Sequence, residues 1–132
     1  MVSKGEVARV VVADDQPTFR EAACEVIADT PGLSLVAVTG RASTLPELIP
    51  QSAAAVLLLD VRMPGEDTLA IALGLRCAHP ELRIVLVSAD SVLDIPEHVF
   101  DAGIGFLPKE LLTPESLTAA ITAREAGPET GW

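Results

Sequence analysis

Charged and hydroxyl side chains stand directly after apolar runs at four places in the sequence. Asp14 and Asp15 follow the first run, Asp60 the third, Ser88 the fourth, and Lys109 comes just after the fifth. If each run is a strand of one parallel sheet, these side chains meet at the carboxyl edge, where such sheets bind ligands. Three carboxylates in one place repel one another, so they need raised pKa values or a hard cation with oxygen ligands.

The chemistry that suits this set is phosphoryl transfer. A Mg²⁺ ion held by one or two carboxylates keeps water in its other positions and leaves room for phosphate oxygens. Lys109 would supply a second positive charge from the opposite side. Because an aspartate carboxylate can attack phosphorus, and Asp60 stands alone at the end of a buried run, we expect Asp60 to be the nucleophile.

The elements that must position these residues are five strands alternating with five helices. Parallel strands need crossover connections, and right-handed crossovers distribute helices over both faces of the sheet, so the pattern predicts an α/β fold. The expected strands are 7–13, 33–38, 55–59, 83–87 and 104–107, and the expected helices are 17–30, 42–51, 67–78, 94–102 and 114–126.

Three local signals set the helix boundaries. Pro46 and Pro50 are expected to break up the second helix and leave it short. Gly103 is suited to a left-handed position that closes the fourth helix. Thr113 is expected to be the N-cap of the fifth helix, with a proline as the first helical residue.

The composition describes one ordinary globular domain. The chain has 132 residues, 49% of them apolar, and a formal net charge of −10, which disfavours direct contact with nucleic acid or an anionic membrane. Cys24 and Cys77 have neither disulfide nor zinc spacing, and no signal peptide or membrane span precedes them, so we expect free thiols in the cytoplasm. The domain is expected over 7–126, with a flexible leader at 1–6 and a flexible tail at 127–132.

The residues resemble the receiver domains of two-component response regulators, from about Val7 to Ala126. This resemblance implies a flavodoxin-like fold, with a five-stranded parallel sheet in the order 2-1-3-4-5 and five helices on both faces. The motifs that carry it are Asp14-Asp15, Asp60 followed by Met63-Pro64, Ser88-Ala89, and Phe106 three residues before Lys109.

The resemblance also implies residue roles at the acidic end of the site. Asp60 would accept a phosphoryl group from a sensor histidine kinase. Asp14, Asp15 and Asp60 would bind Mg²⁺, helped by the backbone carbonyl of Arg62. The domain would then phosphorylate and dephosphorylate itself and would not act as an enzyme on other substrates.

Further roles follow for the hydroxyl and the aromatic ring. Ser88 and Lys109 would hold phosphoryl oxygens. Ser88 would move toward the phosphoryl group and Phe106 would fill the vacated space, which reshapes the face of the fourth helix, fifth strand and fifth helix. That face would bind a partner or a second receiver in a homodimer.

The stretches 14–21 and 105–110 look most like regulators that carry a C-terminal helix-turn-helix DNA-binding domain. This sequence lacks such a domain, so we expect a stand-alone receiver or a fragment of a longer regulator.

The sequence departs from the usual receiver pattern at four positions. Thr68 stands where the family usually has glycine, which leaves the path of the loop after Asp60 open. Ser88 replaces the commoner threonine, and Phe106 replaces the commoner tyrosine. Pro108 precedes the lysine instead of following it, and its peptide bond could be cis or trans.

Two other functions remain open at this point. A degenerate receiver would act as an interaction module without phosphorylation, although the intact acid cluster argues against it. An aspartate-nucleophile phosphatase usually has Asp-x-Asp, whereas Arg62 stands two residues after Asp60. Arg62 and Asp90 either pair across the site or form a solvated surface pair that contributes little.

Overall fold

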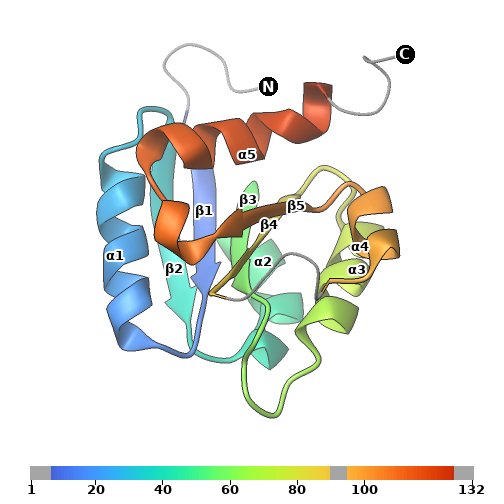
Figure 1. Ribbon diagram of the computed structural model, residues 1–132. Helices are drawn as coiled ribbons and strands as arrows, with labels where there is room; N and C mark the ends of the chain where they lie inside the picture. The colour runs from blue at the N-terminus through green and yellow to red at the C-terminus, as the bar shows by residue number, and fades with distance from the viewer. Residues whose placement is uncertain (1–6, 90–94, 127–132) are drawn as a thin grey trace.

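The computed structural model describes residues 7–89 and 95–126 as a sheet enclosed by helices (Figure 1). The strands are β1 (Ala8–Ala13), β2 (Leu33–Thr39), β3 (Val56–Asp60), β4 (Arg83–Ser88) and β5 (Gly105–Pro108). The helices are α1 (Pro17–Ala28), α2 (Leu45–Ser52), α3 (Thr68–Ala78), α4 (Glu97–Asp101) and α5 (Pro114–Ala126), with short 3-10 turns η1 (Ala42–Thr44) and η3 (Lys109–Leu111).

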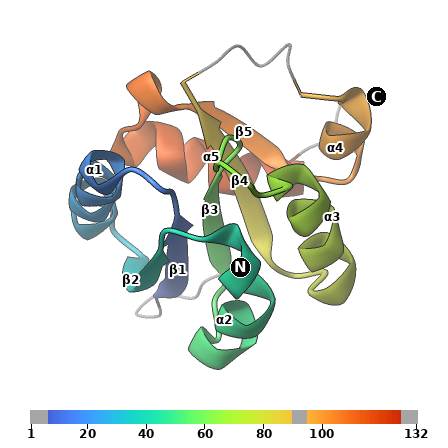
Figure 2. The ribbon, with the colours of Figure 1, turned by 90° about the horizontal axis from the view of Figure 1, so that it is seen from below.

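The sheet has five strands in the order β2-β1-β3-β4-β5, and every pair is parallel. This is the order that the resemblance implies. Helices α1 and α5 cover one face, and α2, α3 and α4 cover the other (Figure 2). The predicted parallel α/β architecture is therefore confirmed.

The core explains why the strand sequences are continuous apolar runs. All five residues of β3 are buried, because this central strand has helices on both of its faces. On one face, Ile27 of α1 and Leu117 of α5 pack against the sheet. On the other, Ile49 of α2 and Leu75 of α3 do so. The two layers fix the sheet on which the site residues are mounted.

Strand register places the polar residues at one edge. β1 and β3 are neighbours, with Ala13 opposite Leu59, so both strands reach the carboxyl edge together. β3 and β4 end side by side, and Ser88 at the end of β4 lies opposite Pro108 of β5. The edge therefore collects residues that are far apart in the sequence.

Helix α2 differs from the prediction. Pro50 lies inside an unbroken helix, so the expectation that it breaks the segment is wrong. A proline there cannot donate to the Pro46 carbonyl and its ring crowds that carbonyl, but the burial of Leu45 and Ile49 outweighs this cost. The helix ends at Ser52, and its C-cap residue, Ala53, has a left-handed φ of 52°.

Helix α4 is shorter than predicted. It begins at Glu97 with Pro96 as its N-cap, whereas the expected start, Asp94, lies outside the described residues. Gly103 has a φ of 85°, which confirms the left-handed position after this helix. The segments predicted as leader and tail also lie outside the described part of the chain.

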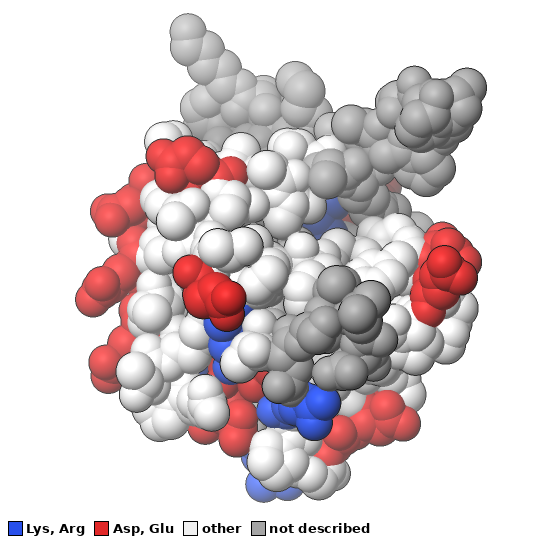
Figure 3. All heavy atoms as spheres, viewed as in Figure 1, with Lys and Arg blue, Asp and Glu red and all other residues white. Residues whose placement is uncertain are grey.

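Acidic side chains face solvent along the flank formed by α1, shown in red in Figure 3. Glu21, Glu25 and Asp29 are all exposed there. Among the helices of the described residues, none is both long enough and apolar enough to cross a membrane.

Candidate functional site

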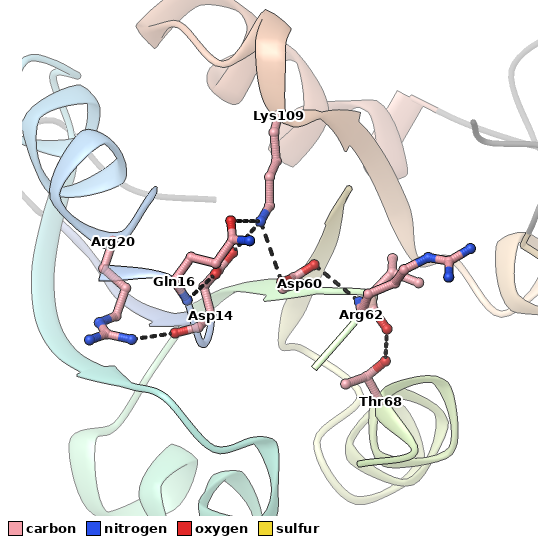
Figure 4. A network of polar contacts seen from close by, with 8 residues as sticks. Asp14, Gln16, Arg20, Asp60, Arg62, Thr68 and Lys109 are labelled. Carbon is pink, nitrogen blue, oxygen red and sulfur yellow. Dashed lines mark hydrogen bonds and ion pairs between the residues drawn. The ribbon is translucent and has the colours of Figure 1, made fainter. Parts of the chain in front are cut away.

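Asp14 is completely buried at the end of β1, and its neighbours fix its position (Figure 4). Its Oδ1 accepts a hydrogen bond from the backbone N–H of Gln16 at 2.8 Å. Arg20 Nη1 donates to the Asp14 backbone carbonyl at 2.7 Å. A Cβ on Gly40 would lie 3.3 Å from that Arg20 nitrogen, so glycine leaves room for the guanidinium. The carboxylate is thus held by the N-cap residue of α1, and the Asp14 backbone by Arg20 in the helix.

Asp60 is the last residue of β3 and is only 4% exposed. Its Oδ1 accepts a hydrogen bond from the backbone N–H of Arg62 at 3.0 Å. Burial raises the pKa of Asp60, and the charge of Asp14 raises it further. The Arg62 N–H and the Lys109 ammonium lower the pKa, but the net shift is upward.

The ammonium of Lys109 lies between the two buried carboxylates (Figure 4). Its Nζ is 2.8 Å from Asp14 Oδ2 and 3.3 Å from Asp60 Oδ2. It also lies 3.5 Å from Gln16 Oε1 and 4.6 Å from the centre of the Phe19 ring, which adds a cation–π contact. One positive charge therefore faces two negative charges within a water-poor site.

The carboxylates also suit a hard cation. Asp14, Asp15 and Asp60 each place an oxygen within 4.8 Å of the others, and Asp15 is the least buried of them. Asp14 Oδ2 is buried and, among the described residues, accepts from no backbone N–H or hydroxyl; its contact is the ion pair with Lys109. Carboxylate oxygens are the hard ligands that Mg²⁺ takes in proteins, so the residues fit this ion.

Ser88 and Phe106 lie on the neighbouring strands. Ser88 is 3% exposed and ends β4 at the same edge as the carboxylates. Phe106 lies within β5, half-buried, and its ring meets that of Phe100 edge-on, with centroids 6.4 Å apart. The peptide bond of Pro108 is trans, as are all the peptide bonds that the structure describes.

The loop from Asp60 to α3 accommodates Thr68 without a glycine. Thr68 is buried, and its hydroxyl donates to the backbone carbonyl of Val61. Among the described non-glycine residues, Ala53 is the one with positive φ, and in this loop Gly65 takes the left-handed position. The side chain of Arg62 points away from Asp60 in Figure 4. The suggested partner of Arg62, Asp90, lies outside the described residues.

Four further residues hold the site and were missed by reading the sequence. Gln16, Phe19 and Arg20 all reach the edge from the start of α1, as described above. Glu66 accepts hydrogen bonds from the backbone N–H groups of Ala42 and Ser43, and so ties two loops together. The signal in the sequence is the position of Gln16, Phe19 and Arg20 just after the first strand, because the beginning of a helix that follows a strand lies over the end of that strand.

Comparison with known proteins identifies the family. The profile of the response regulator receiver domain matches residues 10–122. The chain belongs to the response regulator receiver domain family. "Probable transcriptional regulatory protein NarL" of Mycobacterium tuberculosis is 33% identical over 120 residues, covering 88% of the chain and 54% of that protein. YxjL of Bacillus subtilis, named an uncharacterized transcriptional regulatory protein, is 32% identical, covering 90% and 55%.

Solved structures give the same fold. The signal receiver domain of the putative response regulator NarL from M. tuberculosis has a TM-score of 0.78 and 31% identity, covering 91% of this chain and 98% of that one. A LuxR-family response regulator from Aurantimonas has a TM-score of 0.78 and 26% identity, covering 92% and 87%. The receiver domain spans about half the length of the curated relatives that it matches.

Membership of the response regulator receiver domain family indicates the general chemistry of the domain. Receiver domains of two-component response regulators are phosphorylated on an aspartate and depend on Mg²⁺ in general. They are generally not enzymes toward other molecules, interact with histidine kinases, and can dimerise. The flavodoxin-like receiver fold expected from the resemblance is confirmed.

Proposed function

We propose that this receiver domain accepts a phosphoryl group on Asp60 from a sensor histidine kinase. The observation that carries the proposal is the position of the Asp60 carboxylate. It ends the buried central strand, lies 3.3 Å from Lys109 Nζ, and has oxygens of Asp14 and Asp15 within 4.8 Å. Asp14 makes the same two kinds of contact, a backbone N–H on Oδ1 and Lys109 on Oδ2, so the place of Asp60 at the end of the buried central strand is what distinguishes it.

In the proposed reaction, an oxygen of Asp60 forms a bond to phosphorus while the phosphorus–nitrogen bond of a phosphohistidine breaks. The electron pair of that bond stays on the imidazole nitrogen, which takes up one proton from solvent and leaves as neutral histidine. Lys109 then holds one phosphoryl oxygen, and the Ser88 hydroxyl holds another. A Mg²⁺ ion, when bound, neutralises charge on the transferring group.

The residues that would hold this ion are Asp14, Asp15 and Asp60, together with the backbone carbonyl of Arg62. Three carboxylates and one ammonium leave an uncompensated charge of about −2 in the site, which a divalent cation balances. Among the described residues, the buried Asp14 Oδ2 contacts the Lys109 ammonium and accepts from no backbone N–H or hydroxyl, which supports a ligand role for this oxygen.

We also propose a phosphorylation-dependent change in the α4–β5–α5 face. Ser88 ends β4 next to β5, and the half-buried Phe106 already touches Phe100 of α4. Movement of Ser88 toward a phosphoryl group would let the Phe106 ring turn inward, which alters the α4 contact. This face would then bind an output partner or a second receiver as a homodimer. A phosphorylation-independent interaction module is the alternative.

The relatives support a proposal for the longer protein. Those that match are named transcriptional regulatory proteins, and the receiver covers about half of each. We propose a C-terminal helix-turn-helix domain as the output and a cytoplasmic location, because transcription regulators act at the chromosome. The net charge of −10 supports the absence of direct nucleic-acid contact by this chain itself.

The test is the intact mass of the protein after incubation with phosphoramidate, with and without Mg²⁺. A gain of one phosphoryl group is expected with Mg²⁺ and not in EDTA. Asp60→Asn should abolish the gain. The matched control is Asp67→Asn, because Asp67 is a nearby acid whose side chain caps α3, and asparagine keeps that cap.

The outcomes separate the functions. Phosphorylation that survives in Asp60→Asn would contradict the assignment of the acceptor. A folded wild-type protein that gains no mass in any condition would favour the phosphorylation-independent module. Steady release of phosphate from a generic phosphate ester would favour the phosphatase.

A further inference from the structure

The peptide unit between Val61 and Arg62 connects two hydrogen bonds on opposite sides. Its carbonyl, on Val61, accepts a hydrogen bond from the buried hydroxyl of Thr68. Its N–H, on Arg62, donates to Asp60 Oδ1 at 3.0 Å. Figure 4 shows this chain of contacts from Thr68 through the backbone to the carboxylate.

A peptide unit is planar, so its two ends cannot turn independently. A donor that fixes the carbonyl direction therefore also fixes the direction of the N–H on the other side. Donation to the carbonyl also polarises the unit and strengthens the hydrogen bond that its N–H makes. The Thr68 hydroxyl thus acts on the Asp60 carboxylate without touching it.

We propose that Thr68 is a positioning residue for the phosphoacceptor. Through the Val61–Arg62 peptide it holds Asp60 Oδ1, which leaves Oδ2 directed at Lys109. This inference rests on the proposed function, because it assigns a role in the reaction of Asp60. A glycine at this position has no hydroxyl, so the contact belongs to the threonine in this chain.

The rest of the loop is fixed at a second point. Glu66 accepts hydrogen bonds from the backbone N–H groups of Ala42 and Ser43, which ties the loop to η1, the turn that precedes α2. The loop ends where the Asp67 side chain accepts a hydrogen bond from the Ala70 N–H at 3.1 Å. With these anchors in place, the Val61–Arg62 peptide is the part of the loop whose orientation depends on Thr68.

The variants are Thr68→Val, which has the same shape without the hydroxyl, and Thr68→Ala, which avoids overpacking if valine does not fit. Thr68→Ser keeps the hydroxyl and is the rescue. Thr30→Val is the matched control, because Thr30 is also buried and its hydroxyl donates to the Val26 carbonyl at 2.6 Å, but on the α1 side.

The first readout is hydrogen exchange of the Arg62 amide in EDTA, referred to the amide of Leu58 in β3. Thr68→Val and Thr68→Ala should lower the protection of Arg62 by about fivefold, the factor that one hydrogen bond of ordinary strength is worth. Thr68→Ser and Thr30→Val should leave it within about twofold of the wild type. If the Thr68 hydroxyl only stabilised the fold, its loss would lower the protection of the Arg62 and Leu58 amides by the same factor.

The second readout is the Mg²⁺ concentration that half-saturates the protein in calorimetry, followed by the rate of phosphorylation by phosphoramidate. In Thr68→Val, the half-saturating Mg²⁺ concentration should rise and the phosphorylation rate should fall, each by about threefold to fivefold. Both quantities should return toward the wild-type values in Thr68→Ser. Unchanged Arg62 protection, or equal effects in Thr30→Val, would overturn the inference. If the wild type is not phosphorylated at all, the proposed function fails, while the exchange result still decides the role of the hydroxyl.

Discussion

Replacing Lys109 by methionine tests the electrostatics of the site most directly. The variant keeps the aliphatic stem and removes the ammonium that lies 2.8 Å from Asp14 Oδ2 and 3.3 Å from Asp60 Oδ2. Both carboxylates are buried, so they cannot regain full hydration. We expect a loss of stability that is large at neutral pH and becomes smaller as the pH falls.

The distances set the size of the effect. With an effective dielectric constant of about 20, each contact contributes roughly 5 to 6 kcal/mol of Coulomb attraction before desolvation is counted. The net loss is smaller, because the remaining carboxylates can share a proton. Binding that proton at pH 7 costs about 4 kcal/mol, at 1.36 kcal/mol for each pH unit above the usual Asp value. The loss should therefore be about 3 to 4 kcal/mol at pH 7.

The sign of the pH dependence follows from linkage. In the variant, a carboxyl pKa in the folded state lies above its unfolded value, so the folded state binds the extra proton more tightly. The difference from the wild type should shrink by about 1.4 kcal/mol per pH unit below pH 7. Urea unfolding in EDTA at pH 7.5, 6.5 and 5.5 measures the difference in unfolding free energy between the wild type and Lys109→Met. The double variant with Asp60→Asn should recover much of the loss, and a loss independent of pH would refute the reasoning.

Three other perturbations have definite expected signs. Burial raises the pKa of Asp60, so the charge of this carboxylate opposes folding above that pKa. Asp60→Asn should therefore raise the melting temperature in EDTA at pH 7.5 by a few degrees. The gain should vanish below pH 3, where the wild-type carboxyl is protonated in both the folded and the unfolded state. Desolvation raises the pKa of Glu66, but the N–H donors of Ala42 and Ser43 lower it more, so the net shift is downward. At pH values above 5, Glu66→Gln should therefore cause a small decrease in the melting temperature. This difference should be lost as the pH falls below the usual pKa of a glutamate. Leu117→Ala removes a fully buried side chain and should cost about 2 to 5 kcal/mol in urea unfolding, whereas a loss below about 1 kcal/mol would mean that α5 is not part of the core.

The fold could be predicted because its signals are local and repeated. The five runs ending at Ala13, Thr39, Asp60, Ser88 and Pro108 are apolar because helices cover both faces, and this leaves a clear pattern in the sequence. The exceptions are places where tertiary packing outweighs local preference. Helix α2 continues through its internal proline because its inner face is buried, and a sequence gives no direct measure of that burial.

The site residues that stand at the ends of strands could be predicted from the sequence, because the carboxyl ends of parallel strands meet at one edge of the sheet. Asp14, Asp60 and Lys109 were placed together by that rule, and the structure brings them into contact. The supporting contacts follow no such rule. The cation–π contact of Phe19 and the hydrogen bond of Thr68 to a backbone carbonyl depend on side-chain direction, which the three-dimensional path of the chain sets.

The edge position of β2 has a consequence for handling the protein in solution. This strand, Leu33–Thr39, carries no charged residue, and Val38 on it is 45% exposed. Open strand edges of this kind pair with other copies unless something prevents it. Here the irregularity at Val36 of β2, where the β1–β2 register shifts, and the net charge of −10 oppose such pairing. The charge vanishes near the isoelectric point of 4.4, so turbidity should appear as buffers approach that pH and clear solutions should persist above about pH 6.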